Sequence, residues 1–365
     1  MNTQDLKKLI GSLLIVGFEG LEPSESVFNF LKTWDLGGVI LFKRNVESME
    51  QVRELNRQLY ASASTTPIIS VDHEGGRVFR LPKPFTSFGP SLDLANLARA
   101  RGDLSLLQAV GQAMAKELRL VGFNVNYAPV LDVHSEASNP IIGDRAFGSK
   151  PEEAAKAALE LWKGLEAVGV RGCGKHFPGH GDTKEDSHLT LPKLTKSQEK
   201  LEACEFVPFV KAIEEGISML MTAHVLYEAL DPDYPATLSP KILQGLLRQR
   251  MAYEGLILSD DLFMQGIVDH WGLEEAAERF LRAGGDMLLL CHQESAQRRV
   301  AAHLVHLAEK DLDFRKSLEE KASRVAHLRP QLSSGFGKLH SSRVLASSAA
   351  LQERILSFLE GLEAT

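Results

Sequence analysis

Short apolar runs recur along the chain, and they constrain the fold more than any other feature of the sequence. Most are continuous rather than alternating, which is typical of strands buried on both faces of a parallel sheet. A polar or glycine-rich loop and then a helix-patterned segment follow each run. The eight runs lie at residues 12–18, 37–42, 67–72, 124–133, 169–177, 217–225, 255–262 and 286–291. Strands that alternate with helices in this way predict an α/β fold, a (β/α)8 barrel of the TIM type.

The segments between the runs carry helix signals. The helix that starts near Ser149 should stop at Gly169, and Pro208 should interrupt the helix that follows Thr195. Ser239 is expected to cap the next helix. A doubly wound sheet is the competing fold, but no G-x-G-x-x-G pattern follows the first apolar run.

The chain has 365 residues, enough for one barrel with an addition or for two domains. Residues from about 296 onward are helix-patterned and charged, with a serine-rich interruption at 329–343. We therefore expect residues 1–330 to form a barrel domain that carries the active site. Residues 331–365 are expected to form a helical C-terminal extension packed on the barrel.

Composition narrows the function classes. The chain is 44% hydrophobic and 24% charged, with a formal net charge of −7 and no run rich in Lys and Arg. This balance argues against nucleic acid or a membrane surface as a partner. Cys173, Cys204 and Cys291 fit neither a disulfide framework nor a zinc spacing, which favours a reducing compartment. The apolar N-terminal run is short and lacks a cleavage site, so we expect a buried strand and a cytoplasmic protein.

Polar residues stand just past the apolar runs. In a barrel of this type the active site forms where the strands end, so these residues are the candidates for it. Glu74 is expected to make structural hydrogen bonds, whereas Asp132 and His224 are candidates for the pocket floor. The full set is Lys43, Arg44, Asn45, Asp72, His73, Glu74, Asp132, His134, Lys175, His176, His224, Asp260 and Asp261.

Residues 174–192 concentrate histidines and acidic side chains among glycines and prolines. A zinc or other divalent site is one interpretation, because the ligand types fit. However, their spacing matches no known ligand pattern, and no H-x-H pair follows the first apolar run. A phosphate cradle is also disfavoured, since the segment lacks the Gly-Lys-Ser/Thr of a P-loop. We therefore expect no metal.

An acid catalyst fits this segment better. Asp186 and His188 are two residues apart, so in an extended loop their side chains project to the same side. A carboxylate beside an imidazole fixes its tautomer and favours the protonated ring, which gives a general acid near neutral pH. A solvated loop pair with no catalytic role is the alternative.

Asp260 and Asp261 end the apolar run at 255–262. Adjacent strand residues face opposite ways, so at least one carboxylate should point into the barrel mouth. A carboxylate there, opposite a general acid, is the arrangement for glycosyl transfer through a covalent intermediate. A helix N-cap is the expected role of Asp261.

Taken together, five segments resemble the bacterial β-N-acetylglucosaminidases of glycoside hydrolase family 3. They occur in the family's order and cover about residues 10 to 290. The loop rich in His and Asp is the most specific, because it separates this branch from the family-3 β-glucosidases. The segments are "GGVILFKRNV", "ISVDHEGGRVFRL", "NPIIGDRAFG", "KHFPGHGDTKEDSHLTLP" and "ILSDDLFMQG".

The resemblance implies a retaining exo-enzyme that removes terminal β-linked N-acetylglucosamine from cell-wall fragments of the muropeptide type, during peptidoglycan recycling. It implies Asp260 as the nucleophile, His188 as the general acid/base and Asp186 as the dyad partner of His188. It implies no cofactor. The substrate-binding residues that it implies are Asp72, Arg80, Arg145, Lys175 and His176.

Some alternatives stay open. His73 stands where relatives often carry Gln, which leaves the fine specificity unassigned. A phosphorylase with the same intermediate is the nearest alternative function, since a histidine acid does not repel an incoming phosphate. A catalytically dead sugar-binding barrel and a metal-dependent hydrolase are more remote. We expect a monomer or a weak homodimer.

Overall fold

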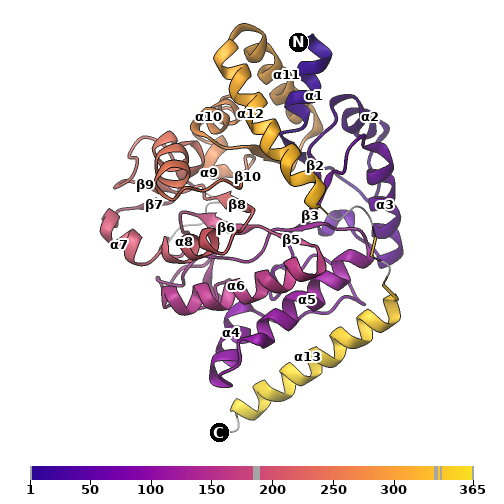
Figure 1. The fold of residues 1–365 in the computed structure, drawn as a ribbon, viewed down its shortest axis with the longest axis vertical. Coiled ribbons are helices and arrows are strands. Elements are labelled where there is room, and N and C mark those ends of the chain that lie inside the picture. Colours follow the sequence, from indigo (N-terminus) through magenta and orange to yellow (C-terminus); the bar gives the residue numbers. More distant parts are fainter. Residues whose placement is uncertain (1, 184–189, 333–335, 338, 364–365) are drawn as a thin grey trace.

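A ring of parallel strands surrounded by helices forms the centre of the molecule (Figure 1). The computed structural model describes residues 2–183, 190–332, 336–337 and 339–363. Within them, the main sheet has nine strands in the order β5-β4-β3-β2-β1-β11-β10-β8-β6. They are β1 (Leu14–Val16), β2 (Gly38–Leu41), β3 (Ile68–Val71), β4 (Val125–Asn126), β5 (Arg171–Gly172), β6 (Gly174–Phe177), β8 (Met219–Thr222), β10 (Leu256–Asp261) and β11 (Met287–Leu290).

The sheet nearly closes on itself, so the predicted barrel is confirmed. Its edge strands, β5 and β6, are successive parts of one predicted run, with only Cys173 between them. Lys175 also bridges to Val130, in the segment that follows β4. Every predicted run contains a strand, and the strand interiors are almost entirely buried, as the continuous apolar pattern requires.

One predicted strand is much shorter than expected. The run at 124–133 forms a ladder only at Val125–Asn126 and then continues as an irregular segment. Pro129 in this segment has no N–H to donate to a neighbouring strand, which is a physical reason for the ladder to stop. Beyond it, Val130 forms a single bridge to Lys175, and the irregular chain that follows contributes Asp132 to the interior.

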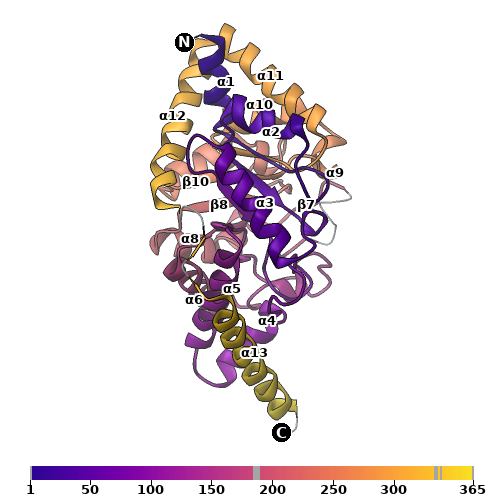
Figure 2. The same cartoon turned by 90° about the vertical axis from the view of Figure 1, so that its right-hand side faces the viewer.

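The helices cover the outside of the barrel (Figures 1 and 2). As predicted, Gly169 ends α6 in the left-handed region, and Ser239 Oγ accepts a hydrogen bond from Ile242 N at 3.1 Å. The predicted interruption is present as the break between α7 and α8 at residues 204–206, and Pro208 lies just after it, in the first turn of α8. The helices are α1 (Thr3–Gly11), α2 (Glu25–Trp34), α3 (Met49–Ser62), α4 (Ser91–Ala100), α5 (Ser105–Leu120), α6 (Pro151–Val168), α7 (Gln198–Ala203), α8 (Val207–Glu214), the π-helix η4 (Lys241–Arg250), α9 (Gln265–Val268), α10 (Leu273–Ala283), α11 (Glu294–Lys310), α12 (Leu312–Leu328) and α13 (Ser341–Glu363).

Short elements complete the fold. A small sheet pairs β7 (Lys193–Leu194) with β9 (Leu226–Tyr227). The 3-10 turns are η1 (Lys43–Asn45), η2 (Gly143–Arg145), η3 (Ala236–Leu238) and η5 (Arg329–Gln331). Of these, η2 matters most for the site, because it carries Arg145.

The C-terminal helices lie at two opposite ends of the molecule. Helices α11 and α12 pack with α1 near the N-terminus, whereas α13 runs along α5 and α4 at the other end (Figures 1 and 2). The guanidinium of Arg101 stacks over the ring of Phe358 at 3.7 Å, and Ile355 is buried. The predicted boundary at residue 330 stays a prediction.

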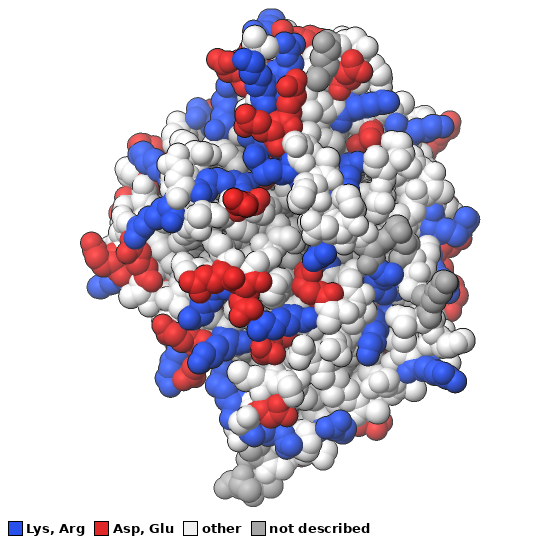
Figure 3. Space-filling view, viewed as in Figure 1, with Lys and Arg blue, Asp and Glu red and all other residues white. Residues whose placement is uncertain are grey.

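On the face shown in Figure 3, acidic and basic side chains are interspersed, and no large area carries charges of only one sign. In the described part of the chain, every helix is too short or too polar to cross a bilayer.

Candidate active site

A polar cavity of about 130 Å³ lies where strands β3, β6 and β10 end. Asp72 directly follows β3, Lys175 and His176 belong to β6, and Asp260 lies near the end of β10. The cavity therefore forms at the carboxyl ends of the strands, where barrel enzymes place their active sites. It is lined by Asp72, Glu74, Val78, Arg80, Ile141, Arg145, Lys175, His176, His180, Met221 and Asp260.

The structure thus brings together six residues that were expected to be functional: Asp72, Arg80, Arg145, Lys175, His176 and Asp260. Their individual roles stay predictions. The apolar lining residues Val78, Ile141 and Met221 were not predicted, because an apolar side chain in the sequence is not distinguishable from an ordinary core residue. His180, one of the histidines of the segment 174–192, also lines the cavity.

A larger cavity, of about 340 Å³, lies at the opposite ends of β8 and β10, against α12. Among the described residues, its lining has one carboxylate, Glu254, with Arg324 and His327 as basic side chains. Volume alone would favour neither of these cavities, since one of about 400 Å³ lies against α6 and α8. The 340 Å³ cavity lies away from the carboxyl ends of the strands, whereas the smaller one lies at those ends and is lined by three carboxylates and three cations. We therefore place the candidate active site at the smaller one.

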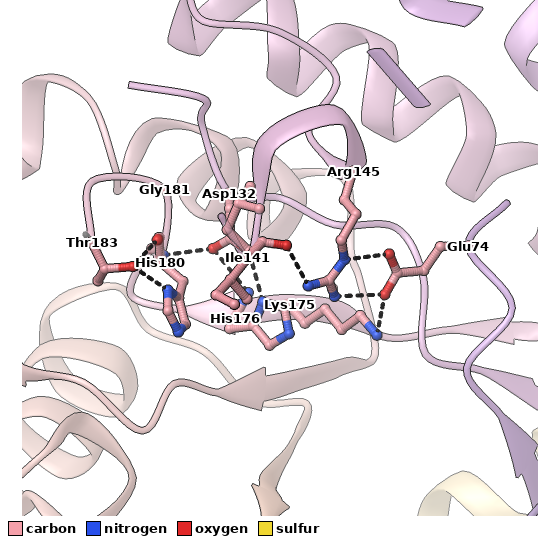
Figure 4. Close-up of polar contacts among 12 residues, drawn as sticks. Glu74, Asp132, Ile141, Arg145, Lys175, His176, His180, Gly181 and Thr183 are labelled. Atoms are coloured by element: carbon pink, nitrogen blue, oxygen red, sulfur yellow. Dashed lines mark hydrogen bonds and ion pairs between the residues drawn. The ribbon is translucent and has the colours of Figure 1, made fainter. Parts of the chain in front are cut away.

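Ion pairs link the charged groups of the smaller cavity (Figure 4). Lys175 Nζ lies 2.6 Å from Asp72 Oδ1 and 2.6 Å from Glu74 Oε1. Burial by itself would lower the pKa of Lys175, but Asp72 and Glu74 outweigh it and raise that pKa above its ordinary value. The ammonium is therefore a stable cation at neutral pH.

The charges of the cavity nearly cancel. Three carboxylates face three cations, so the cavity has little net formal charge to offer a ligand. Such a cavity suits an uncharged polar ligand, whose hydroxyl and amide groups need fixed donors and acceptors. The carboxylates are Asp72, Glu74 and Asp260, and the cations are Arg80, Arg145 and Lys175.

Asp132 holds one of the lining histidines in place. Its Oδ2 lies 2.7 Å from His176 Nδ1, and its Oδ1 accepts hydrogen bonds from the backbone N–H groups of His176 and His180 at 3.1 and 2.7 Å. Burial by itself would raise the pKa of Asp132, but the contact with His176 outweighs it and lowers that pKa. Asp132, a candidate for the pocket floor, therefore orients the His176 ring.

Asp260 and Asp261 point in different directions, as predicted for neighbours on a strand. Asp260 lines the cavity, and its Oδ1 accepts a hydrogen bond from Asp261 N at 2.8 Å. Asp261 Oδ1 instead accepts from Phe263 N at 3.2 Å and Cys291 N at 3.1 Å. The expected helix N-cap role of Asp261 is wrong, because α9 begins only at Gln265 and the side chain fixes the turn before it.

His73 and His224 are buried but do not line the cavity. His224 Nδ1 lies 2.8 Å from Thr237 Oγ1, so it belongs to the barrel wall. The ring centroids of His73 and Phe79 are 4.6 Å apart. Burial first, and then the nearby Arg80, lowers the pKa of His73 to about 3, which keeps the ring neutral.

The expected catalytic pair Asp186 and His188 lies outside the described residues. The segment that leads to it is well anchored: Asn139 Nδ2 donates to His180 O at 2.9 Å and to Gly181 O at 3.0 Å. Asp182 pairs with Lys196 at 3.0 Å. Among the residues that the structure describes, no three His, Cys, Asp or Glu side chains are grouped as metal ligands would be.

A nearly closed parallel barrel with a charged cavity at its carboxyl end is the architecture of a barrel enzyme. Residues 5–328 match the glycosyl hydrolase family 3 N terminal domain. The chain therefore belongs to glycosyl hydrolase family 3, and the membership predicted from the five segments is confirmed.

Several bacterial proteins are similar to this chain over most of its length. A β-hexosaminidase of Nitrosomonas eutropha is 41% identical over 259 residues, which is 70% of this chain and 74% of the relative. A family-3 β-N-acetylglucosaminidase from Paenibacillus sp. str. FPU-7 superimposes with a TM-score of 0.87 at 34% identity, over 96% of this chain and 68% of that one.

NagZ from Neisseria gonorrhoeae superimposes with a TM-score of 0.77 at 32% identity, over 96% of this chain and 97% of its own. That protein has also been solved in complex with a zinc ion.

Proposed function

We propose that this chain is a retaining exo-β-N-acetylglucosaminidase that acts on cell-wall fragments of the muropeptide type. The observation that carries the proposal is the position of Asp260, a strand-end carboxylate in the same cavity as Asp72, Arg145, Lys175 and His176. The names of its family-3 relatives, which include β-hexosaminidase and β-N-acetylglucosaminidase, support the reaction class.

The sugar is held by the charged groups of the cavity. Lys175 and Arg145 donate to hydroxyl and acetamido oxygens, while Asp72 accepts from hydroxyls. His176 enters the site in one orientation, because Asp132 holds its Nδ1. A cavity of about 130 Å³ suits one sugar unit better than an extended chain, which supports removal of terminal residues.

The chemistry is a double displacement. Asp260 attacks the anomeric carbon from the face opposite the leaving group and forms a glycosyl-aspartate. His188, protonated and held by Asp186, gives its proton to the departing oxygen and then takes a proton from the incoming water. Two inversions at the same carbon retain the configuration. The roles of Asp186 and His188 rest on the sequence, since both lie outside the described residues.

We place the reaction in the cytoplasm and without a metal. Cys173, Cys204 and Cys291 are free thiols, which suits a reducing compartment. None of the proposed steps needs a Lewis acid, because a carboxylate nucleophile and an imidazolium supply attack and proton transfer. A monomer or weak homodimer is proposed.

A chromogenic assay tests the proposal. The purified full chain is given nitrophenyl β-N-acetylglucosaminide beside nitrophenyl β-glucoside, with and without inorganic phosphate and with EDTA. We expect release of nitrophenol from the first substrate only, at a rate that neither phosphate nor EDTA changes. No turnover would contradict the proposal; phosphate-dependent turnover would indicate the phosphorylase, and loss in EDTA a metal-dependent enzyme.

A further inference from the structure

The carboxylate of Glu74 lies between the two buried cations of the cavity (Figure 4). Its Oε1 is 2.6 Å from Lys175 Nζ and 2.8 Å from Arg145 Nη2, and its Oε2 accepts from Arg145 Nε at 2.8 Å. The side chain of Glu74 is only 3% exposed. Both of its oxygens are thus occupied by protein donors, although the residue lines the cavity.

A tight turn fixes Glu74 independently of these ion pairs. Glu74 N donates to Val78 O at 3.0 Å, and Gly75 forms a bridge with Val78. Gly75 has φ +103°, and a Cβ there would lie 2.7 Å from Gly89 O. A side chain at position 75 would therefore be strained, so the turn depends on glycine. The turn thus fixes the backbone that carries Glu74, and the two cations come to its carboxylate from other elements.

The pKa shifts of Lys175 and Glu74 show how this carboxylate interacts with the two cations. Arg145 acts to lower the pKa of Lys175, as expected for two cations near each other, whereas Asp72 and Glu74 act to raise it. Burial by itself would raise the pKa of Glu74, but Arg145 and Lys175 outweigh it and hold that pKa well below its ordinary value. Glu74 is therefore ionised at any pH at which the enzyme is assayed.

We propose that Glu74 is a positioning residue, which holds Lys175 and Arg145 in place for the sugar without contacting the sugar itself. This role rests on the proposed function. Lys175 is shared between Glu74 and Asp72, so Glu74 also indirectly fixes Asp72. Among the described residues, Asp72 Oδ1 has Lys175 as its partner, which leaves Oδ2 for a sugar hydroxyl.

The variant Glu74→Gln tests the role, because it keeps the shape of the side chain and removes its charge. We expect KM for nitrophenyl β-N-acetylglucosaminide to rise about 10- to 100-fold, the scale of a lost hydrogen bond to a charged group. The value of kcat should change much less, since Asp260 is untouched. The basic limb of the kcat/KM profile should stay in place, because it reports the loss of the proton that His188 donates and not the titration of Lys175.

Two further variants separate positioning from simple stability. Glu74→Asp keeps the charge, so its KM should lie closer to that of the wild type than the KM of Glu74→Gln. Glu166→Gln is the matched control: Glu166 also pairs with an arginine, Arg171, and accepts from Gly172 N at 2.9 Å, but it lies on α6 away from the cavity. It should lower the melting temperature and leave KM and the pH profile as in the wild type.

The outcomes distinguish this proposal from the proposed function. A wild-type chain that does not hydrolyse the substrate contradicts the proposed function before any variant is made. An active wild type with a Glu74→Gln variant of unchanged KM contradicts the positioning role alone. The same conclusion follows if Glu74→Gln, like Glu166→Gln, changes only the melting temperature.

Discussion

At the residue scale, most charged groups of the cavity are fixed before any ligand arrives. Asp132 orients His176, and Glu74 links Lys175 to Arg145. Buried charges are costly unless they are paired and hydrogen-bonded, so each group stabilises its partner in one geometry. The binding of a sugar then costs little rearrangement of the protein.

Two buried histidines make the folded state sensitive to acid. Burial is the first cause that lowers the pKa of His73 from 6.5 to about 3 and that of His180 from 6.5 to about 4. As the pH falls below 6.5, the unfolded chain takes up these protons before the folded protein does, so stability falls with pH. Each such histidine costs up to about 1.4 kcal/mol per pH unit in this window.

We therefore predict that His73→Gln reduces the acid sensitivity. The drop in melting temperature between pH 7.5 and pH 5 should be smaller than the wild-type drop, because one of the two buried histidines no longer contributes. Thermal unfolding at the two pH values measures this. His306→Gln, a change on the exposed side of α11, should keep the full drop. A His73→Gln drop as large as that of the wild type would contradict the neutral, buried state of His73.

The residue-scale contacts could be predicted only in part from the sequence. Motifs named six of the lining residues, because short patterns such as "DHEGGR" and "GKHF" carry them on strand ends. The contact of Glu74 with Arg145 joins residues 71 positions apart, and that of Lys175 with Asp72 joins residues 103 apart. No local pattern encodes such pairs, since the folded barrel alone brings them together.

At the scale of elements, the anchoring of the segment after β6 sets the approach to the cavity. Gly181 packs so closely on the chain after β4 that a Cβ at its position would lie 1.6 Å from Val133 O. The backbone of Gly181 also accepts a hydrogen bond from Asn139. The segment can therefore reach this position only with glycine at 181.

Gly181→Ala should push this segment away from residue 133. We expect it to destabilise the fold by about 1–3 kcal/mol, as overpacking of a buried site does, and to lower turnover of the chromogenic substrate. Urea unfolding and steady-state kinetics measure the two effects. Gly245→Ala in η4 is the control, because its Cβ would have 3.9 Å to the nearest atom. Wild-type stability and turnover in Gly181→Ala would show that this close approach does not matter.

Element positions were more predictable than element lengths. Continuous apolar runs located all the barrel strands, because burial on both faces requires that composition. In the run at 124–133, only two residues form a ladder with neighbouring strands, and the run at 169–177 is split into two strands at Cys173. Such strand lengths depend on the hydrogen bonds to neighbouring strands, which a local pattern does not contain. The turn role of Asp261 was missed for the same reason: its partner Cys291 belongs to another strand end.

At the scale of the whole molecule, the candidate active site and the C-terminal helices lie in different parts of the fold. The charged cavity lies at the carboxyl ends of the strands, whereas α11, α12 and α13 pack on the outside at opposite ends of the molecule (Figure 2). Helix α13 contributes packing to α5 and α4 and no lining residue to the cavity. Helix α13, which belongs to the expected C-terminal extension, thus packs on helices of the barrel. The boundary of the extension at residue 330 is a proposal.

The central claim is that Asp260 is the nucleophile, and a trapped intermediate tests it most directly. The chain is incubated with a fluorinated N-acetylglucosaminyl fluoride that forms the glycosyl-enzyme faster than it is hydrolysed, then digested and analysed by mass spectrometry. Asp260→Asn and Asp261→Asn serve as the variant and its matched neighbour. We predict a sugar adduct on the peptide that contains Asp260, in the wild type and in Asp261→Asn, and none in Asp260→Asn. An adduct on another residue, or an unchanged adduct in Asp260→Asn, would contradict the claim.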